Sequence, residues 1–565
     1  MRIFPLILNL IFALSLFSQT RYWIYFKDKG HYQQLPLAVQ EQIVDSLLTE
    51  KAKERRRIRG NPGFLRNTLF QDLPVEERYL DSLRTVGFRI HGVSRWFNAA
   101  SGTASAQQLQ RIRTFHFVER IEPVRSWHFR KEEKEPFAPN ATFHKISGDS
   151  LPYRYGFSEL QITFHRIHEL HRLGFTGKNV IIAMFDTGFR YSHPALQHLR
   201  NRIIGEYDFI QHDSITANQA GDAKSQDSHG TLTLSVIGGF LPDTLIGPAF
   251  DAQFILAKTE KVDQEIHLEE DNWTFAAEWA EQLGVDIVSS SLGYSVFDEG
   301  EGNYTYRDMD GQSTIVTRAA NYLAQHGVLV VNAAGNEGAS FWRYITAPAD
   351  GFFVLAVGAV KSDHELAYFS SRGPTFDGRI KPDVVALGVD VLGAGAQGGY
   401  YRANGTSLST PIVAGIAAQL LQAFPNLTLT DMLNILRKSG DNAEHPDNDR
   451  GWGEVDALRA YNLAQNAHSH PPGSFQILPP WPNPVSGKGN VVNFQIVLPD
   501  AYPIQLEIYN LLGQQMTRLS IQGQVGTNLF WWNPEQNHSP IASGIYFYRI
   551  LCGPWETIGK LVILR

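Results

Sequence analysis

Between residues 153 and 466, apolar residues alternate between continuous runs and helical spacing. The run over 180–185 is uninterrupted and has the length of a strand. Farther along, helical patterns over 273–282 and 315–326 each end at a glycine, and each is followed by another short apolar run. Strands that are apolar on both faces, alternating with helices that stop at glycine, are typical of a parallel sheet between helices. The pattern therefore predicts an α/β domain over 153–466, with a parallel sheet flanked by helices.

Two smaller regions flank this domain. Residues 19–130 alternate short strand patterns with helical ones, which predicts a small α+β unit. The strand candidates are 22–26, 88–93 and 118–122, and the helical patterns cover 37–59, 74–86 and 104–112. Residues 485–565 carry short alternating strands separated by Gly and Pro turns, which predicts a C-terminal β-sandwich. The stretches 131–152 and 467–484 are predicted linkers, and the first, which is polar and charged, suits proteolytic processing.

The first 18 residues predict a secretory signal peptide. Met1 and Arg2 precede an apolar run over 3–17 that ends near Ser18. The alternative is an N-terminal membrane anchor, but the run is shorter than the ~20 residues that a spanning helix needs. Export is the better interpretation, and no later stretch is long and apolar enough to span a membrane.

Composition narrows the function classes. With 565 residues, 43% of them hydrophobic and 19% charged, the chain is ordinary globular material spread over several domains. The formal net charge of −7 disfavours a nucleic-acid partner. The basic run 51–59 also carries Glu54 and continues a helical pattern, so it predicts a solvated helix face. Cys552 is the single cysteine, which excludes an intrachain disulfide and a zinc-thiolate cluster.

Polar turns that contain glycine follow three of the predicted buried strands, at 186–188, 289–293 and 332–338. In parallel sheets the chemistry gathers at the carboxyl ends of strands. Two further polar residues, His229 and Ser407, each stand near the predicted start of an apolar helical run. Taken alone, Ser407 is best interpreted as part of a helix cap, because most Ser and Thr clusters before helices serve that purpose.

Four of these residues together change that interpretation. Asp186, His229, Ser407 and Asn336 supply a carboxylate, an imidazole, a hydroxyl and a side-chain amide. Acyl transfer by a serine needs those four groups. The chain order Asp, His, Ser is also one of the three orders in which this triad is known. The combination therefore predicts a nucleophilic role for Ser407.

The segments around these residues resemble the motifs of the subtilase (subtilisin-like, peptidase S8) family of serine proteases. The matching segments are Asp186-Thr187-Gly188, His229-Gly230-Thr231, Ala334-Gly335-Asn336 and Gly405-Thr406-Ser407-Leu408-Ser409-Thr410-Pro411, together with 369–374 and 381–384. Leu408 and Ser409 depart from the commonest residues of the serine motif, but neither change removes a catalytic group.

The resemblance implies a subtilisin-like fold and a serine-type endopeptidase that hydrolyses peptide bonds in proteins. In that family's mechanism Ser407 would be the nucleophile, His229 the general base and Asp186 the residue that orients the imidazole. Asn336 would stand in the oxyanion hole together with the Ser407 backbone N–H.

The resemblance also implies how a substrate binds. Ser291, Leu292 and Gly293 are similar to the strand that pairs with the substrate main chain, which implies broad specificity because side chains are not read there. Catalysis in this family requires no cofactor. Structural calcium is frequent in subtilases, but no calcium-binding loop can be recognised in this sequence, so metal ligands stay unknown.

The flanking regions resemble known companions of this enzyme class. Residues 19–130 are similar to the inhibitory propeptide of subtilases, which implies synthesis as a self-inhibited zymogen. Residues 485–565 resemble the C-terminal sorting domain of the type IX secretion system, through the segments 481–484, 508–513, 542–548 and 560–565. A carbohydrate- or protein-binding β module is the alternative for this region.

These resemblances set the expected partners and location. The partners would be protein or peptide substrates and the type IX secretion machinery. The protein would be secreted or attached to the cell surface after export through the periplasm and the outer membrane.

Two rival functions compete with this interpretation. His165, His168 and His171 invite a metalloprotease interpretation, but the zinc motif places its two histidines four residues apart, and here the spacing is three. A polar helix face is the preferred interpretation of these histidines. The second rival is a catalytically dead, subtilase-like binding module, which the presence of all four chemical groups disfavours.

Overall fold

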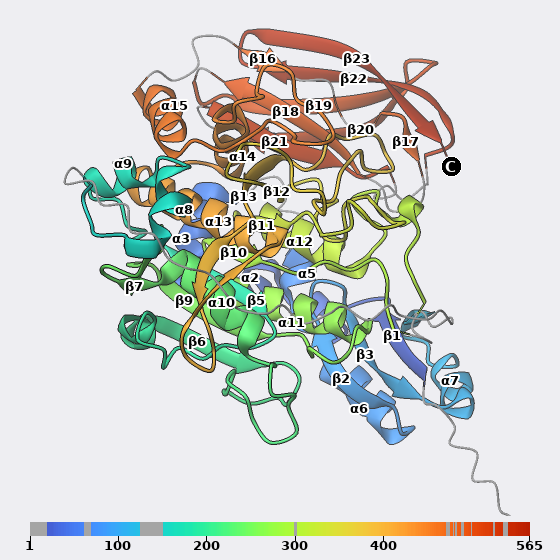
Figure 1. The fold of residues 1–565 in the computed structure, drawn as a ribbon. Helices are drawn as coiled ribbons and strands as arrows, with labels where there is room; N and C mark the ends of the chain where they lie inside the picture. The colour runs from blue at the N-terminus through green and yellow to red at the C-terminus, as the bar shows by residue number, and fades with distance from the viewer. Residues whose placement is uncertain are drawn as a thin grey trace, which may run out of the picture. The chain divides into compact units, whose positions relative to one another are not determined.

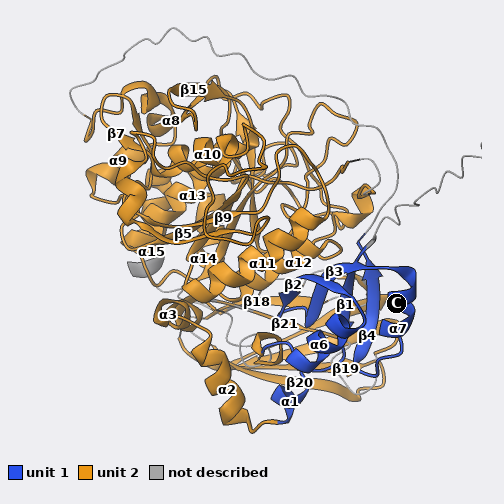
Figure 2. Ribbon diagram, turned by 90° about the horizontal axis from the view of Figure 1, so that it is seen from below, with its two compact units in different colours: residues 1–34, 74–124 blue, residues 35–73, 125–565 orange. Residues whose placement is uncertain are grey.

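The computed structural model describes residues 20–60, 69–124, 151–298, 302–469, 475–477, 480, 483–486, 491–498, 500–523, 526–534 and 541–564. The predicted signal peptide (1–18), residues 131–150 of the first predicted linker and parts of the linker 467–484 lie outside the described residues. Contacts divide the chain into two compact units, one made of 1–34 with 74–124 and the other of 35–73 with 125–565 (Figure 2).

A seven-stranded parallel sheet forms the centre of the larger unit (Figure 1). Its strands are β5 (Ile181–Asp186), β6 (Ile203–Asp208), β9 (Gln253–Lys258), β10 (Ile287–Ser290), β11 (Leu329–Ala333), β12 (Val354–Val360) and β13 (Val384–Leu387). They lie in the order β13-β12-β11-β10-β5-β9-β6, and every neighbouring pair is parallel. Every residue of β5 and of β12 is buried, as continuous apolar runs predict.

Helices cover both faces of this sheet. The pair α10 (Ser228–Gly238) and α13 (Thr406–Ala423) packs together, and so does the pair α11 (Leu268–Leu283) and α12 (Ile315–Gln325). Figure 2 shows one pair on each side of β5 and β9. The remaining helices of this region are α8 (Glu159–Thr163), α9 (Ile167–Arg172), α14 (Leu429–Lys438) and α15 (Ala457–Ser469). The predicted α/β fold with a parallel sheet flanked by helices is confirmed.

Small residues in α13 allow that helix to lie close to its neighbours. A Cβ atom added to Gly415 would stand 2.2 Å from Cγ of Pro248, far inside van der Waals contact. Nearly all of α13 is buried, and Ile412, Ile416 and Leu420 join the core that lies between this helix and the sheet. Two short antiparallel pairs complete the region: β7 (Phe240–Leu241) with β8 (Leu245–Ile246), and β14 (Val391–Ala394) with β15 (Tyr400–Ala403).

The smaller unit is an antiparallel sheet with helices, an α+β fold as predicted. Its strands, in the order β2-β3-β1-β4, are β1 (Thr20–Phe26), β2 (Arg89–Ser94), β3 (Ala99–Ala104) and β4 (Val118–Pro123). Its helices are α1 (His31–Gln34), α6 (Glu77–Thr85) and α7 (Ala106–Ile112). Ser105 and Gln108 form a reciprocal capping box at the start of α7.

Residues 35–73 belong to the larger unit instead, although they stand between elements of the smaller one in the sequence. They form α2 (Leu37–Ser46), α3 (Glu50–Arg59) and α5 (Leu69–Asp72). The single helical pattern predicted over 37–59 is therefore two helices. The break falls at Thr49, whose side chain accepts a hydrogen bond from the Ala52 N–H and begins α3.

The C-terminal region contains two sheets around one core, which confirms the predicted strand-rich domain. One sheet has β16 (Gln476–Ile477), β18 (Val492–Leu498) and β21 (Gly526–Trp532). The other has β17 (Val485–Ser486), β19 (Pro503–Asn510), β20 (Gln515–Gln522), β22 (Gly544–Cys552) and β23 (Trp555–Leu564). Phe494 and Phe530 from the first sheet share a buried cluster with Leu506 and Ile550 from the second. Across the described parts of the chain, no helix has the length and apolarity to cross a membrane.

Candidate active site

The candidate residues come from the carboxyl edge of the parallel sheet. Asp186 is the last residue of β5, and His229 and Ser407 are each the second residue of a helix, α10 and α13 respectively. The first turn of α10 lies very close to the end of β5, because a Cβ on Gly230 would stand 2.2 Å from the Gly188 carbonyl oxygen. Glycine at 230 therefore lets the imidazole reach the carboxylate.

The Asp186 carboxylate is buried and bonded on both oxygens. Oδ1 lies 2.7 Å from His229 Nδ1 and also accepts the Thr187 N–H at 2.7 Å. Oδ2 accepts the Thr233 hydroxyl at 3.0 Å. With Nδ1 facing a carboxylate, the neutral imidazole carries its proton on that nitrogen and presents Nε2 as an acceptor. The sequence interpretation missed Thr233, although its place one helical turn after His229 is a usable signal.

The pKa of His229 lies above its ordinary value. Burial alone would lower this pKa, but the charge of Asp186 and its hydrogen bond to the ring outweigh burial. The arrangement stabilises the imidazolium that forms when the ring accepts a proton. Such a ring is suited to act as a general base and then as a general acid.

Ser407 is mostly buried and is held against the end of β10. Its hydroxyl donates to the Ser291 carbonyl oxygen at 3.3 Å, while the Ser291 hydroxyl donates to the Ser407 carbonyl oxygen at 2.9 Å. Ser407 also stands in the first turn of α13, where backbone N–H groups have no partner within the helix. These N–H groups and the helix dipole favour negative charge at this point.

The Asn336 side chain is exposed but has a fixed orientation. Its Oδ1 accepts the Thr406 N–H at 2.9 Å and the Thr406 hydroxyl at 3.1 Å. Because the carbonyl end is occupied in this way, the NH₂ end stays available as a donor beside the start of α13. The structure thus brings the amide of Asn336 next to the residue that precedes Ser407.

The segment Ser291 to Gly293 follows directly after the last residue of β10, and Ser291 is buried. Leu292 and Gly293 are partly exposed, and the Leu292 carbonyl oxygen accepts the Asn332 side-chain amide at 2.9 Å. Tyr294, next along, is buried, and its hydroxyl donates to Glu260 Oε1 at 2.6 Å. No sequence motif pointed to Glu260, which lies two residues after β9.

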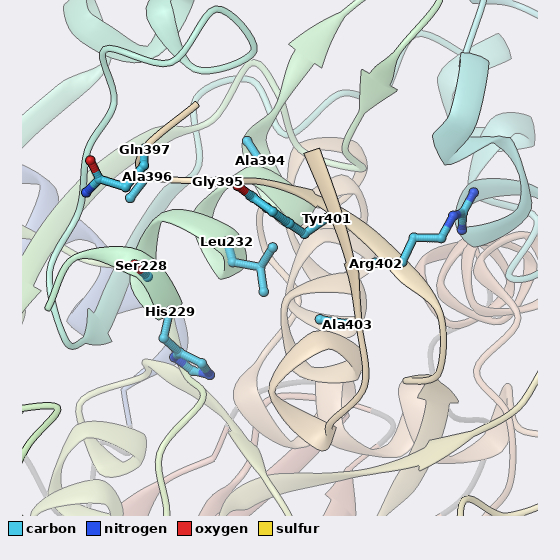
Figure 3. A pocket seen from close by; sticks show the side chains of 10 residues that line it. All are labelled: Ser228, His229, Leu232, Ala394, Gly395, Ala396, Gln397, Tyr401, Arg402 and Ala403. Carbon is cyan, nitrogen blue, oxygen red and sulfur yellow. The ribbon is translucent and has the colours of Figure 1, made fainter. Parts of the chain in front are cut away.

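A pocket of about 400 Å³ lies beside His229 (Figure 3). It is bounded by the first turns of α10 and by the β14–β15 hairpin. Its lining residues are Ser228, His229, Leu232, Ala394, Gly395, Ala396, Gln397, Tyr401, Arg402 and Ala403. Arg402 points away from the others in Figure 3, and its guanidinium donates to the Asp390 and Phe157 carbonyl oxygens at 2.7 and 3.2 Å. Small and apolar groups therefore dominate the lining around His229.

The three histidines of the rival interpretation do not converge. His165 Nδ1 lies 2.8 Å from the Val455 carbonyl oxygen, and its Nε2 accepts the Leu387 N–H at 3.0 Å. His171 bonds to the Tyr155 hydroxyl and to the Pro248 carbonyl oxygen, at 2.8 and 3.0 Å.

Burial lowers the pKa of His165 and of His171 to about 4. The expected polar helix face is therefore wrong for these two residues, which are buried and bonded within the core. Within the described residues, no cluster of three or more His, Cys, Asp or Glu is arranged to hold a metal ion.

A parallel α/β sheet with an Asp–His pair and a serine in the first turn of a helix at its carboxyl edge defines the class of serine-peptidase-like α/β proteins. Comparison with known families identifies the group within that class. The model of the subtilase family matches residues 177–453. Models of the peptidase S8 propeptide domain of Bacteroidota and of the secretion system C-terminal sorting domain match residues 21–138 and 480–564. The chain therefore carries a subtilase domain, and subtilases are serine endopeptidases, together with a propeptide domain and a sorting domain.

Several known proteins resemble the chain over about half of its length. Subtilisin-like protease SBT6.1 of Arabidopsis thaliana is 29% identical over 317 residues, which cover 53% of this chain and 27% of that protein. Serine protease AprX of Bacillus subtilis is 32% identical over 322 residues, which cover 50% of this chain and 66% of that protein. The solved structure of MycP1 without its N-terminal propeptide shares 24% identity, covers 54% of this chain and 96% of its own, and gives a TM-score of 0.41. The chain thus spans less than two thirds of the length of the first two relatives.

Proposed function

We propose that the protein is a secreted serine endopeptidase that acts through the triad Asp186, His229 and Ser407 and is made as a self-inhibited zymogen. The observation that supports this proposal most directly is the 2.7 Å contact between His229 Nδ1 and the buried Asp186 carboxylate, in a domain of the subtilase family. Ser407 stands in the first turn of α13, at the same edge of the sheet.

In the proposed reaction the Ser407 hydroxyl turns from the Ser291 carbonyl towards His229 Nε2 and gives up its proton as Oγ attacks the peptide carbonyl. The imidazolium, paired with Asp186, then protonates the leaving amine. Water, deprotonated by the same ring, hydrolyses the acyl-enzyme and releases Ser407. Every proton that moves passes through His229, whose raised pKa suits the role.

The tetrahedral oxyanion would receive two donors, the Asn336 side-chain amide and the Ser407 N–H. Thr406 holds the amide oxygen, so the NH₂ group is oriented before the substrate arrives. Asn336→Ala should therefore reduce kcat about 10²–10³-fold, the range known for removal of the oxyanion-hole asparagine from subtilisin.

The substrate would bind as an extended strand along Ser291, Leu292 and Gly293. Main-chain pairing recognises the backbone of the substrate and not its side chains, so the specificity of cleavage should be broad. His229 delivers the proton to the leaving amine, so the adjoining pocket would receive residues on the leaving-group side of the cut. Its small apolar lining favours small apolar side chains there. Catalysis should need no cofactor, and any calcium would be structural.

The domains on either side of the protease domain support its assignment as an exported protein that is made as a zymogen. A sorting domain of this kind indicates export followed by secretion or cell-surface attachment. We assign the type IX machinery, acting after passage through the periplasm, as its partner in that export. The propeptide domain supports synthesis as a zymogen that is cut between residues 130 and 155.

Ser407→Ala tests the catalytic assignment. The variant should lose casein hydrolysis and labelling by a serine-directed fluorophosphonate. Ser409→Ala is the matched control, because Ser409 is buried in the same helix with its hydroxyl bonded to the Ala386 carbonyl oxygen at 3.0 Å. That control should keep both properties. Hydrolysis that survives in Ser407→Ala would reject the triad, and an unlabelled wild-type chain would favour the catalytically dead module.

N-terminal sequencing of active enzyme tests the zymogen assignment. A new N-terminus between residues 130 and 155 is expected in active material. Fully active protein that starts at Gln19 would end the zymogen hypothesis.

A further inference from the structure

Residues 35–73 lie within the stretch that matches the propeptide family, yet they pack on the protease domain. Helix α3 runs across the C-terminal ends of α11 and α12. The Thr49 N–H donates to the Gln282 carbonyl oxygen at 3.0 Å. A Cβ on Gly284 would stand 2.9 Å from the Ala52 nitrogen, and one on Gly327 would stand 2.6 Å from the Arg59 carbonyl carbon. The backbone of α3 is therefore in direct contact with the ends of both helices.

Arg55 is the centre of this contact and is completely buried. Its guanidinium donates to the carbonyl oxygens of Val285 at 2.8 Å, His326 at 3.1 Å and Glu281 at 3.3 Å. It also pairs with the Glu281 carboxylate. The last carbonyl groups of a helix have no partner within the helix and carry partial negative charge. The single Arg55 side chain thus supplies hydrogen-bond donors to carbonyl oxygens at the C-terminal ends of both α11 and α12.

Two further arginines of α3 complete the contact. Arg56 donates to both oxygens of Glu281, at 2.8 and 2.9 Å, and to both oxygens of Asp72, at 2.7 and 3.1 Å. Arg59 pairs with Asp286, whose other oxygen accepts the Ile181 N–H at 2.9 Å. Three arginines thus face three carboxylates in a buried cluster, and the half-exposed Lys51 Nζ lies 3.7 Å from Asp286 Oδ2. Such pairs are hard to separate one at a time, because each partner would be left charged and without water.

This contact lies at the edge of the sheet opposite to the catalytic residues. Asp286 immediately precedes β10 and bonds to the first residue of β5, whereas Asp186 ends β5 and Ser291 follows β10. A strand of four to six residues separates the two edges by roughly 13–20 Å. A segment bound here therefore leaves the carboxyl edge, where the substrate would lie, uncovered.

We propose that the amino edge of the protease sheet is a docking site for the arginine-bearing helix α3, and that residues 35–73 stay bound there after the chain is cut downstream of Val124. This inference rests on the proposed zymogen. Because 35–73 is continuous in sequence with 20–34 and with 74–124, one downstream cut leaves the four-stranded unit tethered. A tether of this kind keeps a released inhibitor at an effective concentration on the order of millimolar. Full activation then requires loss of the anchor or a second cut beside it.

The test uses the full-length chain after it has processed itself. Size-exclusion chromatography in moderate salt, with mass spectrometry of each fraction, locates the fragment that contains 35–73. It should co-elute with the active protease in the wild type. It should separate in Arg56→Ala, with activity appearing several-fold sooner after the cut. Arg57→Ala is the matched control, since Arg57 is exposed on the same helix. A wild-type fragment that separates as completely as the Arg56→Ala fragment overturns the proposal.

A second measurement does not depend on folding of the variant or on self-cleavage. In the uncut Ser407→Ala chain, hydrogen exchange should be as slow for the amides of α3 as for those of α11. If the amide hydrogens of α3 exchange as fast as those of an isolated short helix, the proposed docking site is wrong. If the wild-type chain is never cut, the zymogen proposal fails, and this measurement still decides whether α3 is docked.

Discussion

At the scale of single residues, the site depends on how firmly Asp186 is held. Its carboxylate accepts hydrogen bonds from Thr187, Thr233 and the imidazole, and it has almost no exposed surface. A buried carboxylate without those donors would be costly. With them, it can stay charged and stabilise a positive ring on His229, and this coupling gives the site its expected pH dependence.

The pH profile of kcat/KM should show this coupling. Asp186 raises the pKa of His229 above its ordinary value of about 6.5, so the ring holds its proton to a higher pH. Activity should therefore fall as pH drops through a pKa above about 6.5. Asp186→Asn should move the acid limb to lower pH and reduce kcat about 10⁴-fold, the size known for this change in another serine protease. An acid limb that does not move in Asp186→Asn would contradict the pairing.

Residue-scale features were predictable where a short motif marks them. Asp186 ends a buried strand, and His229 and Ser407 stand in the first turns of helices, so sequence and fold point to the same place. No sequence motif identifies Glu260. Its partner Tyr294 is 34 residues away, and the hydrogen bond between them forms only when the chain has folded. Contacts that join residues distant in sequence and carry no recognisable motif could not be predicted from one chain.

At the scale of elements, the loop between β9 and α11 and the first turn of α11 each carry a buried carboxyl group. Glu260 accepts the Tyr294 hydroxyl, and Glu269 accepts two backbone N–H groups of the same loop, each at 2.9 Å. Burial is the main cause that raises the pKa of Glu260 to about 8, and the charges of Glu265 and Asp186 add to it. Burial likewise raises the pKa of Glu269 to about 10. Glu260 in the loop and Glu269 in the first turn of α11 are therefore favoured in their protonated forms near pH 7.

Glu260→Gln should change how stability depends on pH. The folded chain holds a proton on Glu260 between its ordinary pKa of about 4.5 and about 8, so stability falls as pH rises through that window. Glutamine mimics the protonated form and keeps an oxygen for Tyr294. In a Ser407→Ala background the variant should match the parent at pH 4 and exceed it by up to about 5 kcal/mol at pH 9, by urea unfolding. Asp263→Asn, exposed on the same loop, should show no such difference, and an equal effect of Glu260→Gln at both pH values would contradict this account.

Element boundaries were predictable where caps are local. The patterns over 273–282 and 315–326 match α11 and α12, whose ends coincide with glycines of left-handed backbone at 284 and 327. The break between α2 and α3 was not predicted, because Thr49 resembles an ordinary helical residue until its capping bond is seen. The solvated face predicted for 51–59 is also wrong for Arg55 and Arg56, which are buried against Glu281.

At the scale of the whole molecule, the chain does not follow the simple order of its predicted regions. The sequence pattern predicts one α+β unit over 19–130, but 35–73 fold onto the protease domain while the sequence on both sides forms the four-stranded unit. The reason is electrostatic and long-range: the arginines of α3 find Glu281 about 225 residues away. No local pattern distinguishes an arginine that remains in water from one that is buried against a distant carboxylate.

The buried cluster of arginines and carboxylates also predicts the pH at which acid releases the anchor, residues 35–73, from the protease domain. Burial alone would raise the pKa of Asp72 and of Glu281, but the positive charges that face them, chiefly His326 and Arg56 for Asp72 and Arg56 and Arg55 for Glu281, hold both pKa values well below the ordinary range. Depressed carboxyl pKa values stabilise the folded contact above the ordinary pKa of about 4 and lose that stabilisation as pH falls below it. Chromatography of the cut chain should therefore show retention from pH 5 to pH 9 and release below about pH 4.

His326 separates this account from a neutral-pH switch. It lies 3.5 Å from Asp72, and burial together with the charge of Arg56 lowers its pKa, although Asp72 and Glu281 act in the opposite direction. Release near pH 6 would mean that protonation of His326, not of the carboxyl groups, opens the contact. His326→Gln then decides the point, because it should abolish a release near pH 6 that depends on the imidazole, whereas release controlled by Asp72 and Glu281 should stay in the acid range. Recovery of protease activity after return to pH 7 is the control that the domain itself has survived the acid, so that loss of the fragment reports the anchor alone.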